Sequence, residues 1–145
     1  MIGVDTNILV YSHREENDFY KPAVECLSQL TKRYDRWAIP WPCIHEFLVV
    51  VTNPRIFKKP TPTMTALAAV ESWLESPTCV ILGEGPGHLD QLKVLLQSAQ
   101  ISGPRIHDAK IAAICLQSGV RELWTADRDF SRFPALKTRN PLITS

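Results

Sequence analysis

The sequence predicts an α/β fold whose central sheet is mainly parallel. Short apolar runs of strand length alternate along the chain with longer stretches in which apolar residues recur at helical spacing. This alternation is typical of β-α-β units, in which helices pack against a parallel sheet. The chain has 145 residues, with no internal repeat and no linker of biased composition. We therefore expect a single domain over residues 1–145.

Four segments have the length and composition of strands, and a fifth, short strand is expected near the end of the chain. The four are Ile2–Asp5, Trp37–Ile39, Cys79–Leu82 and Glu122–Thr125, and the fifth is Leu142–Ile143. Apolar stripes at helical spacing predict helices over the intervening segments, which contain Leu27, Phe47, Val70, Leu92 and Ile111. The expected sheet therefore has four to five strands.

Composition sets only broad limits on function. Apolar residues make up 45% and charged residues 21% of the chain, as in an ordinary globular domain, and the formal net charge is +1. A nearly neutral total neither requires nor excludes a nucleic-acid partner, because basic side chains can gather on one face. No run approaches the ~18 apolar residues of a membrane span, and no signal-peptide pattern is present. We expect a cytoplasmic protein.

The cysteine spacing argues against a zinc site. Cys26, Cys43, Cys79 and Cys115 lie far apart and form no C-x-x-C pair. We expect them to be small buried thiols in a reducing compartment, with a structural disulfide as the less favoured alternative.

Two aspartates follow expected strands. Asp5 ends the first strand, and Asp127 falls just beyond Glu122–Thr125. Ligands of open parallel sheets bind beyond the carboxyl ends of the strands, so both aspartates are placed for a ligand or a metal ion. Asp5 also begins a good capping and turn sequence. Asp129, which could instead form a turn or pair with Arg132, is an alternative to Asp127.

Two further acids lie on expected helices. Glu46 interrupts the segment 41–51, which is apolar on nearly every face and predicts a mostly buried helix. A carboxylate there needs a metal ion, an arginine or a proton as compensation. Asp108 precedes apolar residues at offsets of three, four, seven and eight, so it heads a buried helix face, with an ordinary N-cap as the alternative.

The four acids together predict a divalent metal site. Carboxylates that converge without a cation repel one another. Mg²⁺ and Mn²⁺ prefer oxygen ligands, relieve that repulsion and hold phosphates. The expected reaction is metal-assisted hydrolysis of a phosphodiester, in which the cation activates a water molecule and stabilises the leaving oxygen.

Several motifs taken together resemble the PIN-domain nucleases, and more narrowly the VapC toxins of bacterial toxin–antitoxin systems. They are Val4-Asp5-Thr6-Asn7-Ile8-Leu9, Glu46 on its apolar helix, His107-Asp108-Ala109, and Leu123-Trp124-Thr125-Ala126-Asp127-Arg128-Asp129-Phe130. The loop Thr52-Asn53-Pro54-Arg55 and the ending Arg139-Asn140-Pro141-Leu142 also resemble one branch of that family. The resemblance spans nearly the whole chain and depends on the order and spacing of these motifs.

This resemblance implies a three-layer α/β/α sandwich, usually dimeric, that cuts RNA with Mg²⁺ or Mn²⁺. Asp5, Glu46, Asp108 and Asp127 match the family's acidic positions. Among them, Asp5 and Asp108 are the expected metal ligands, and Glu46 and Asp127 are second or shared ligands. The fourth position varies in the family, which leaves Asp129 as an alternative.

The resemblance also implies a partner and supporting residues. The partner is a VapB-type antitoxin that covers the active site, often with an arginine among the carboxylates. Thr6, Asn7 and Thr125 are the expected supporting residues.

A basic loop, two histidines and four tryptophans are further candidates for functional or structural roles. Arg55, Lys58 and Lys59, with Phe57, could hold phosphates and stack a base of RNA, although a solvated basic loop is the commoner reason for such a run. His45 and His107 adjoin acidic candidates, but neighbouring helical residues point about 100° apart, so we expect packing or capping roles. The four tryptophans are expected in the core or at a dimer interface.

The favoured function is a toxin-type endoribonuclease of a type II toxin–antitoxin system. A housekeeping RNA-processing nuclease and a non-catalytic RNA-binding scaffold are the alternatives. A Mg²⁺-dependent phosphatase is less favoured, because position seven is Asn7 and not a second aspartate. The sequence contains neither a G-x-S-x-G elbow nor a Gly-rich phosphate loop.

Overall fold

A five-stranded parallel sheet forms the centre of residues 1–143, the part of the chain described by the computed structural model. The strands are β1 (Ile2–Val4), β2 (Trp37–Pro40), β3 (Cys79–Leu82), β4 (Glu122–Trp124) and β5 (Thr138–Arg139), in the order β3-β2-β1-β4-β5. All neighbours are parallel, and Gly3 of β1 lies opposite Ala38 on one side and Leu123 on the other. The predicted parallel α/β architecture is confirmed.

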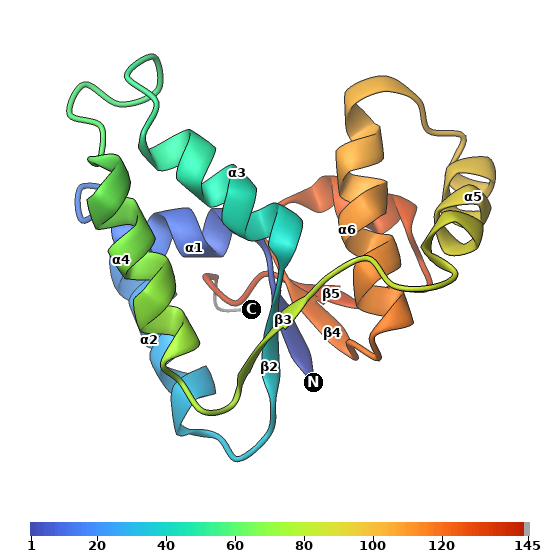
Figure 1. Cartoon of the computed structure of the whole chain (residues 1–145), viewed down its shortest axis with the longest axis horizontal. Helices are drawn as coiled ribbons and strands as arrows, with labels where there is room; N and C mark the ends of the chain where they lie inside the picture. The colour runs from blue at the N-terminus through green and yellow to red at the C-terminus, as the bar shows by residue number, and fades with distance from the viewer. Residues whose placement is uncertain (144–145) are drawn as a thin grey trace.

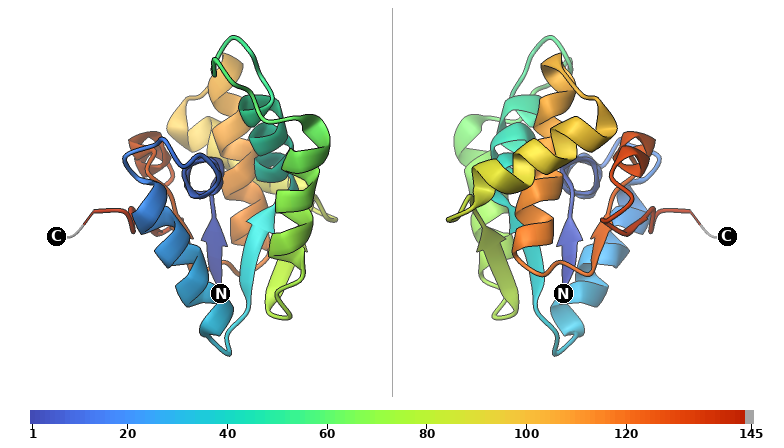
Figure 2. Two further views of the ribbon diagram at one scale, coloured as in Figure 1. Left: turned by 90° about the vertical axis from the view of Figure 1, so that its left-hand side faces the viewer. Right: turned by 90° about the vertical axis from the view of Figure 1, so that its right-hand side faces the viewer.

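Helices cover both faces of this sheet (Figures 1 and 2). They are α1 (Thr6–His13), α2 (Tyr20–Lys32), α3 (Trp41–Val51), α4 (Thr63–Leu74), α5 (His88–Ala99) and α6 (Ile106–Gln117), with the short 3₁₀ turns η1 (Gly103–Arg105) and η2 (Arg128–Arg132). The chain steps from β1 to β2 to β3 in one direction, and right-handed crossovers place α1 to α4 on one face. It then returns across the sheet to β4, which places α5 and α6 on the other face.

Four predicted strands lie within one residue of their expected bounds, but the fifth prediction was wrong. Leu142–Ile143 lie in a turn, and the fifth strand is β5 instead. The main chain decides this pairing, because the amide of Leu123 donates to the carbonyl of Lys137 at 2.9 Å and the amide of Thr125 donates to that of Arg139 at 2.9 Å. Leu142 is buried without belonging to the sheet, so its apolar character gave a misleading signal.

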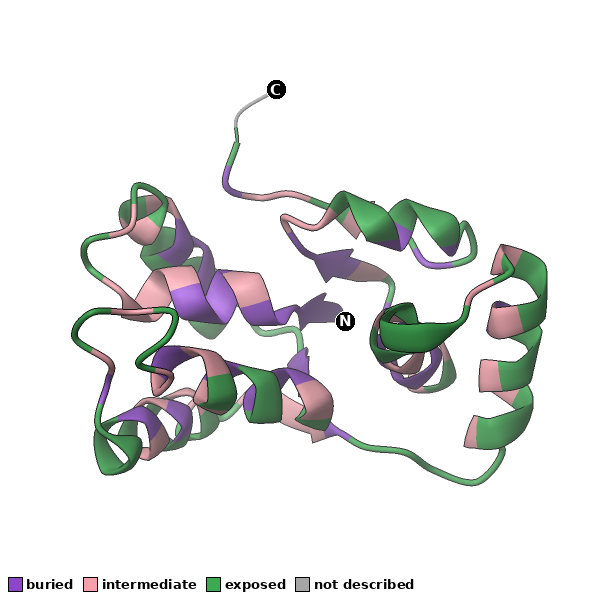
Figure 3. Ribbon diagram, turned by 90° about the horizontal axis from the view of Figure 1, so that it is seen from above, coloured by how far each residue is buried: buried purple, intermediate pink, exposed green. Residues whose placement is uncertain are grey.

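The cysteines lie in or at the edge of the apolar core. Buried residues, drawn in purple in Figure 3, lie in the strands and in the helices that pack on the sheet. Cys26, Cys43 and Cys115 are buried in this core, Cys79 is half-buried, and all four are free thiols, as predicted. Among residues 1–143, no helix combines the length and the apolar character that crossing a bilayer requires.

The strand order creates a crevice at the carboxyl edge of the sheet. The chain leaves β1 toward one side of the sheet and leaves β4 toward the other. Connections that run apart in this way leave a gap above the two strands, which is where open α/β sheets bind ligands. Figure 3 looks down on this edge.

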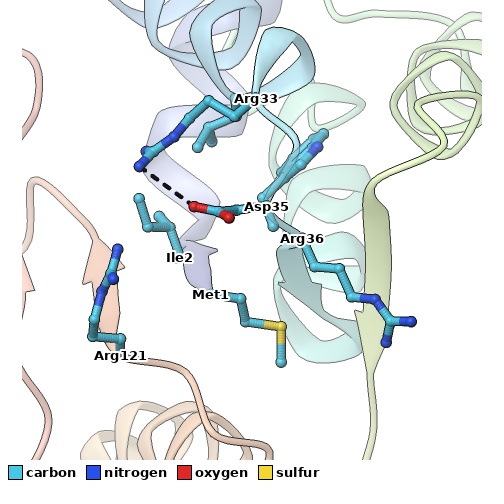
Figure 4. Close-up of a pocket in the computed structure, with 8 residues that line it drawn as sticks. Met1, Ile2, Arg33, Asp35, Arg36 and Arg121 are labelled. Atoms are coloured by element: carbon cyan, nitrogen blue, oxygen red, sulfur yellow. Dashed lines mark ion pairs between the residues drawn. The ribbon is translucent and has the colours of Figure 1, made fainter.

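The opposite, amino edge of the sheet carries a hollow of different chemistry (Figure 4). It is lined by Met1, Ile2, Arg33, Asp35, Arg36 and Arg121, among others. Asp35 Oδ2 lies 3.9 Å from Arg33 Nη2. Because the charged lining of this hollow is three arginines and a single aspartate, it does not offer the oxygen ligands that a divalent cation needs.

Candidate active site

An acidic cleft of ≈ 250 Å³ lies beyond the carboxyl ends of β1 and β4. Its acidic lining residues are Asp5, Glu46, Asp108 and Asp127. They come from the end of β1, from α3, from α6 and from the loop after β4. The four carboxylates that the sequence singled out therefore lie in one cleft. Thr6, Asn7, Val10, Tyr11 and Val50 complete its lining.

Asp5 is the most buried acid of the cleft, with 4% of its surface exposed. Its Oδ1 accepts a hydrogen bond from the Thr6 amide at 2.8 Å, and its Oδ2 accepts one from Thr125 Oγ1 at 2.7 Å. Burial raises the pKa of Asp5; its hydrogen bonds oppose this rise, and the nearby Glu46 carboxylate adds to it. Asp5 caps α1, so its capping role and its position in the cleft coexist.

Thr125 and Asn7 join the two strand ends of the cleft. Thr125 Oγ1 accepts hydrogen bonds from Asn7 Nδ2 at 3.3 Å and from the Asp127 amide at 3.0 Å, in addition to donating to Asp5. Asn7 Oδ1 accepts from the Ala126 amide at 3.1 Å. These bonds fix the loop after β4 against the start of α1. They therefore hold Asp5 and Asp127 at fixed positions relative to one another.

Glu46 reaches the cleft from α3, but its side chain is not buried as predicted. The apolar composition of α3 suggested burial on all faces, yet the helix borders the cleft and leaves one side open to solvent. The exposed residues on that side are Trp41, His45, Glu46 and Val49. Glu46 Oε2 accepts a hydrogen bond from Thr6 Oγ1 at 3.1 Å. Within residues 1–143 Glu46 forms no ion pair, and solvation removes the need for a compensating arginine.

Asp108 carries the clearest electrostatic signal of the cleft. It is the third residue of α6, which begins at Ile106, so the alternative that Asp108 is the N-cap was wrong. Burial raises the pKa of Asp108 to about 6, and repulsion from neighbouring acids, Asp127 first and Asp5 second, adds to the rise. The carboxylates therefore do repel one another, as the sequence predicted.

Asp127 and Asp129 both lie beside Asp108. One carboxylate oxygen from each of these three residues lies within 4.8 Å of the other two. Asp127 also caps η2, because its Oδ1 accepts from the Asp129 amide at 2.9 Å. The pairing of Asp129 with Arg132 is not found in the described chain. Asp127 and Asp129 were predicted as alternatives, whereas the fold places both beside Asp108.

The donor set of Asp108, Asp127 and Asp129 fits a hard divalent cation. All its donors are carboxylate oxygens, which Mg²⁺ and Mn²⁺ prefer. An ion that holds ligands at about 2.1 Å separates them by at most about 4.2 Å, so small side-chain rotations would bring the trio to bonding distance. Asp5 is not a member of this trio and lies deeper in the same cleft.

Sequence reasoning missed Cys43, which contacts an acid of the cleft, and Tyr11, which lines it. Cys43 Sγ lies 3.5 Å from Asp5 Oδ1 and donates to it, and burial raises the pKa of this thiol so that it keeps its proton. Tyr11 lines the cleft from α1. Helical spacing was the available signal, since Cys43 lies three residues before Glu46 and Tyr11 lies four after Asn7.

The basic loop between α3 and α4 is solvated at its charged positions. Arg55, Lys58 and Lys59 are exposed. Arg14 holds the loop, because its guanidinium carbon lies 4.0 Å from the Phe57 ring centroid and its Nη1 donates to the Lys59 carbonyl at 3.0 Å. Arg14 covers one face of the Phe57 ring, and the stacking of a base on this half-buried ring stays a prediction.

The histidines and tryptophans divide by exposure. Trp37 and Trp124 are buried and Trp73 is half-buried, whereas Trp41 is 45% exposed. His45 packs against Trp41, with ring centroids 5.8 Å apart and an angle of 24° between the planes. His107 is exposed, so the expected packing is found for His45 alone.

Comparison with known proteins relates this cleft to a nuclease family. The PIN domain family matches residues 2–136. The VapC ribonuclease Mb2897 of Mycobacterium bovis is 34% identical over 142 residues, which cover 98% of this chain and 96% of that protein.

Two solved structures share the fold. VapBC2 from Rickettsia felis, bound to a DNA fragment from its promoter, has a TM-score of 0.70 at 22% identity and covers 96% of this chain and 98% of its own. A toxin–antitoxin complex from Klebsiella pneumoniae has a TM-score of 0.65 at 19% identity, with 97% and 98% covered.

Neutralising Asp108 should stabilise the metal-free protein. The raised pKa means that the folded state resists ionisation, so stability is highest below the ordinary value of 3.8 and falls as the pH rises to about 6. In EDTA at pH 7.5 we expect Asp108→Asn to raise Tm by about 2–4 °C, which corresponds to ~1 kcal/mol after allowance for solvent screening. Below pH 3.8 the gain should vanish, because both side chains are then neutral.

The matched control is Asp18→Asn, which removes an exposed carboxylate outside the cleft. Thermal unfolding followed by circular dichroism checks both variants. Equal Tm values for wild type and Asp108→Asn at pH 7.5 would contradict the repulsion described here.

Proposed function

This chain belongs to the PIN domain family as a VapC-type ribonuclease toxin, and we propose that its residues 1–145 form one nuclease domain that hydrolyses RNA phosphodiesters in the acidic cleft. The observation that carries this proposal is the convergence of four carboxylates from distant parts of the chain on one cleft at the carboxyl edge of the sheet. A structural protein would gain nothing from this arrangement, because it costs stability without a cation.

The proposed ligands follow from the positions of the acids. Asp108, with its raised pKa, and Asp5 at the floor of the cleft are the principal metal ligands. Asp127 and Glu46 act as second or shared ligands. Asp129 lies close to Asp108, which supports Asp129 as a further shared ligand. PIN-domain nucleases use a divalent metal ion, and we propose Mg²⁺, with Mn²⁺ as a substitute. A bound cation would supply a Lewis acid that lowers the pKa of water and screens the phosphate charge.

The remaining residues of the cleft have positioning roles in this proposal. Thr125 and Thr6 donate hydrogen bonds to Asp5 and Glu46, which keeps the accepting oxygens of those carboxylates fixed. Asn7 holds the loop that carries Asp127. Such preorganisation matters because a displaced ligand costs catalysis heavily. In the reaction, a water oxygen adds to phosphorus, one P–O ester bond breaks, and the departing ribose oxygen takes up a proton.

The proposed partners are an antitoxin and a second copy of the chain. A VapB-type antitoxin would inhibit the enzyme by covering the cleft, and an inserted arginine would relieve the repulsion among its acids. The toxin–antitoxin complexes of the same fold support this partner. We also propose a homodimer and a cytoplasmic location, where the free thiols would remain reduced.

The basic loop is proposed as an RNA contact of secondary importance. It follows α3 directly, and the α3 residue Val50 lines the cleft. Arg14 fixes the loop, so Arg55, Lys58 and Lys59 are presented to solvent from an ordered segment. Their role would be to attract phosphates rather than to stack bases.

Removing either principal acid should abolish RNA cleavage. We expect Asp5→Asn and Asp108→Asn each to lower the cleavage rate of labelled RNA at least about 100-fold in Mg²⁺, because each would remove a negative ligand. EDTA should stop the wild-type reaction, and added Mn²⁺ should restore it. Asp18→Asn serves as the control. A variant at Asp5 or Asp108 that cuts at the wild-type rate would remove that residue from the ligand set.

Growth tests the toxin role separately from the chemistry. Induced expression of the wild type in bacteria without the antitoxin should arrest growth. Glu46→Gln should not, because it removes a carboxylate of the cleft. Immunoblots must show equal protein levels. Continued growth with an active wild-type enzyme would favour a housekeeping RNA-processing role, and continued growth with an inactive one would favour a scaffold.

Charge reversal tests the basic loop. We expect Lys58→Glu with Lys59→Glu to weaken binding of single-stranded RNA and to reduce the salt slope of log K by about 0.7 for each lost phosphate contact. The double variant Lys21→Glu with Lys32→Glu, on exposed positions of α2, controls for total charge. Equal affinities and slopes for the two double variants would rule out a specific contact of the loop.

A further inference from the structure

A groove continues from the acidic cleft between residues of α3 and residues of α6. Figures 1 and 3 show the positions of these two helices. Its first part, ≈ 540 Å³, shares Glu46 and Asp108 with the cleft and is also lined by His107. Its second part, ≈ 560 Å³, ends at Trp41 and Gly83. The two parts share Pro42, His45 and Lys110. We call this path the α3–α6 groove.

An aromatic surface lies at the far end of the groove. Trp41 is 45% exposed and stacks on His45, so the imidazole supports the indole while part of the indole remains open to solvent. Trp41 lies five residues before Glu46, which is about 7.5 Å along the helix axis. This is close to the span of one nucleotide, so a strand with its scissile phosphate at the acids would bring the neighbouring base to Trp41.

The nitrogen-bearing side chains of the groove lie between the acids and Trp41. His45 comes from α3, and His107 and Lys110 come from α6. Lys110 lines both parts of the groove, and its ammonium group can donate to a phosphate oxygen. A groove with a stacking surface and a cation in its middle is the usual arrangement for single-stranded nucleic acid.

We propose that the α3–α6 groove binds one unpaired nucleotide of the RNA next to the bond that is cleaved. The base stacks on the exposed part of Trp41, which His45 supports, and its phosphate is held by Lys110. This inference rests on the proposed function and adds to it one binding position for a nucleotide. A paired base cannot use such a surface, because its faces are already covered by its neighbours in the duplex.

RNA is favoured over a protein occupant by two features of the groove. It opens directly into the acidic cleft through Glu46 and Asp108, so any strand that reaches those acids also reaches the groove. In addition, its middle carries Lys110 and two imidazoles. An apolar protein segment would leave the charged nitrogen of Lys110 without a partner. Val49, 64% exposed, is the residue that a second copy would use, and the experiment includes that outcome.

The experiment compares RNA affinities in EDTA, where no cleavage occurs, for a 12-nucleotide single strand and a hairpin duplex. Trp41→Ala should weaken binding of the single strand about tenfold, the loss typical of one base–aromatic stack, and should change duplex binding less than twofold. Trp41→Phe should restore most of the affinity. Lys110→Ala should lower the single-strand salt slope by about 0.7. The matched controls are Tyr34→Ala and Lys93→Ala, which alter exposed residues away from the groove.

A base deletion in the RNA identifies the contact. A set of 12-nucleotide RNAs is made, each lacking the base at a different position. For one of these RNAs, wild type and Trp41→Ala should bind with equal affinity, because the base that stacks on Trp41 is then missing. The proposal is overturned if Trp41→Ala binds the single strand as well as the wild type does, if it loses single strand and duplex equally, or if the wild type binds neither RNA. A fall in oligomer mass for Trp41→Ala, measured by light scattering, would assign the groove to a second copy. Failure of the wild type to cut RNA in Mg²⁺ would instead contradict the proposed function, because the binding assay does not depend on cleavage.

Discussion

The burial of the Asp5 carboxyl group is the constraint on which the acidic cleft depends. A carboxyl group removed from water needs hydrogen-bond donors, and each donor of Asp5 comes from a defined element. Thr6 belongs to α1, Cys43 to α3, and Thr125 to the segment after β4. Satisfying Asp5 therefore brings together α1, the helix α3 that carries Glu46 and the loop after β4 that carries Asp127. Thr6 extends this coupling, since its hydroxyl donates to Glu46.

The cleft stores electrostatic strain in the folded chain. The pKa of Asp108 lies at about 6 because burial and four other carboxylates disfavour its charge. Natural proteins accept such local costs where function requires them, and the rest of the fold compensates. Here the compensation comes from the apolar core on both faces of the sheet, which includes the fully buried Trp37, Phe47 and Phe130. Any agent that brings positive charge to the cleft releases part of this strain, whether it is a metal ion or a guanidinium group.

The sequence predicted the parts of the fold that depend on local pattern. The strands at Ile2 and Cys79 were found because a continuous apolar run marks a strand buried on both faces. The position of Asp127 followed from the end of such a strand.

The predictions that were wrong or undecided depended on tertiary context. Glu46 was expected to be buried because α3 is apolar throughout, but composition cannot reveal that one side of α3 faces a cleft. The choice between Asp127 and Asp129 could not be made, because η2 turns both toward Asp108. The strand predicted at Leu142 was wrong because a buried turn residue and a buried strand residue are both apolar in the sequence.

The spread of the acids along the chain has a consequence for biosynthesis. Asp5 leaves the ribosome long before Asp127 and Asp129, because α1 to α6 lie between them in the sequence. The strand that lies beside β1 and orders Asp5 through Thr125 is β4, which is also made late. A nascent chain that has not reached β4 therefore lacks Asp127, Asp129 and the strand beside β1 that orders Asp5 through Thr125. The acidic cleft cannot form in the translating polypeptide until β4 and the loop after it have been made.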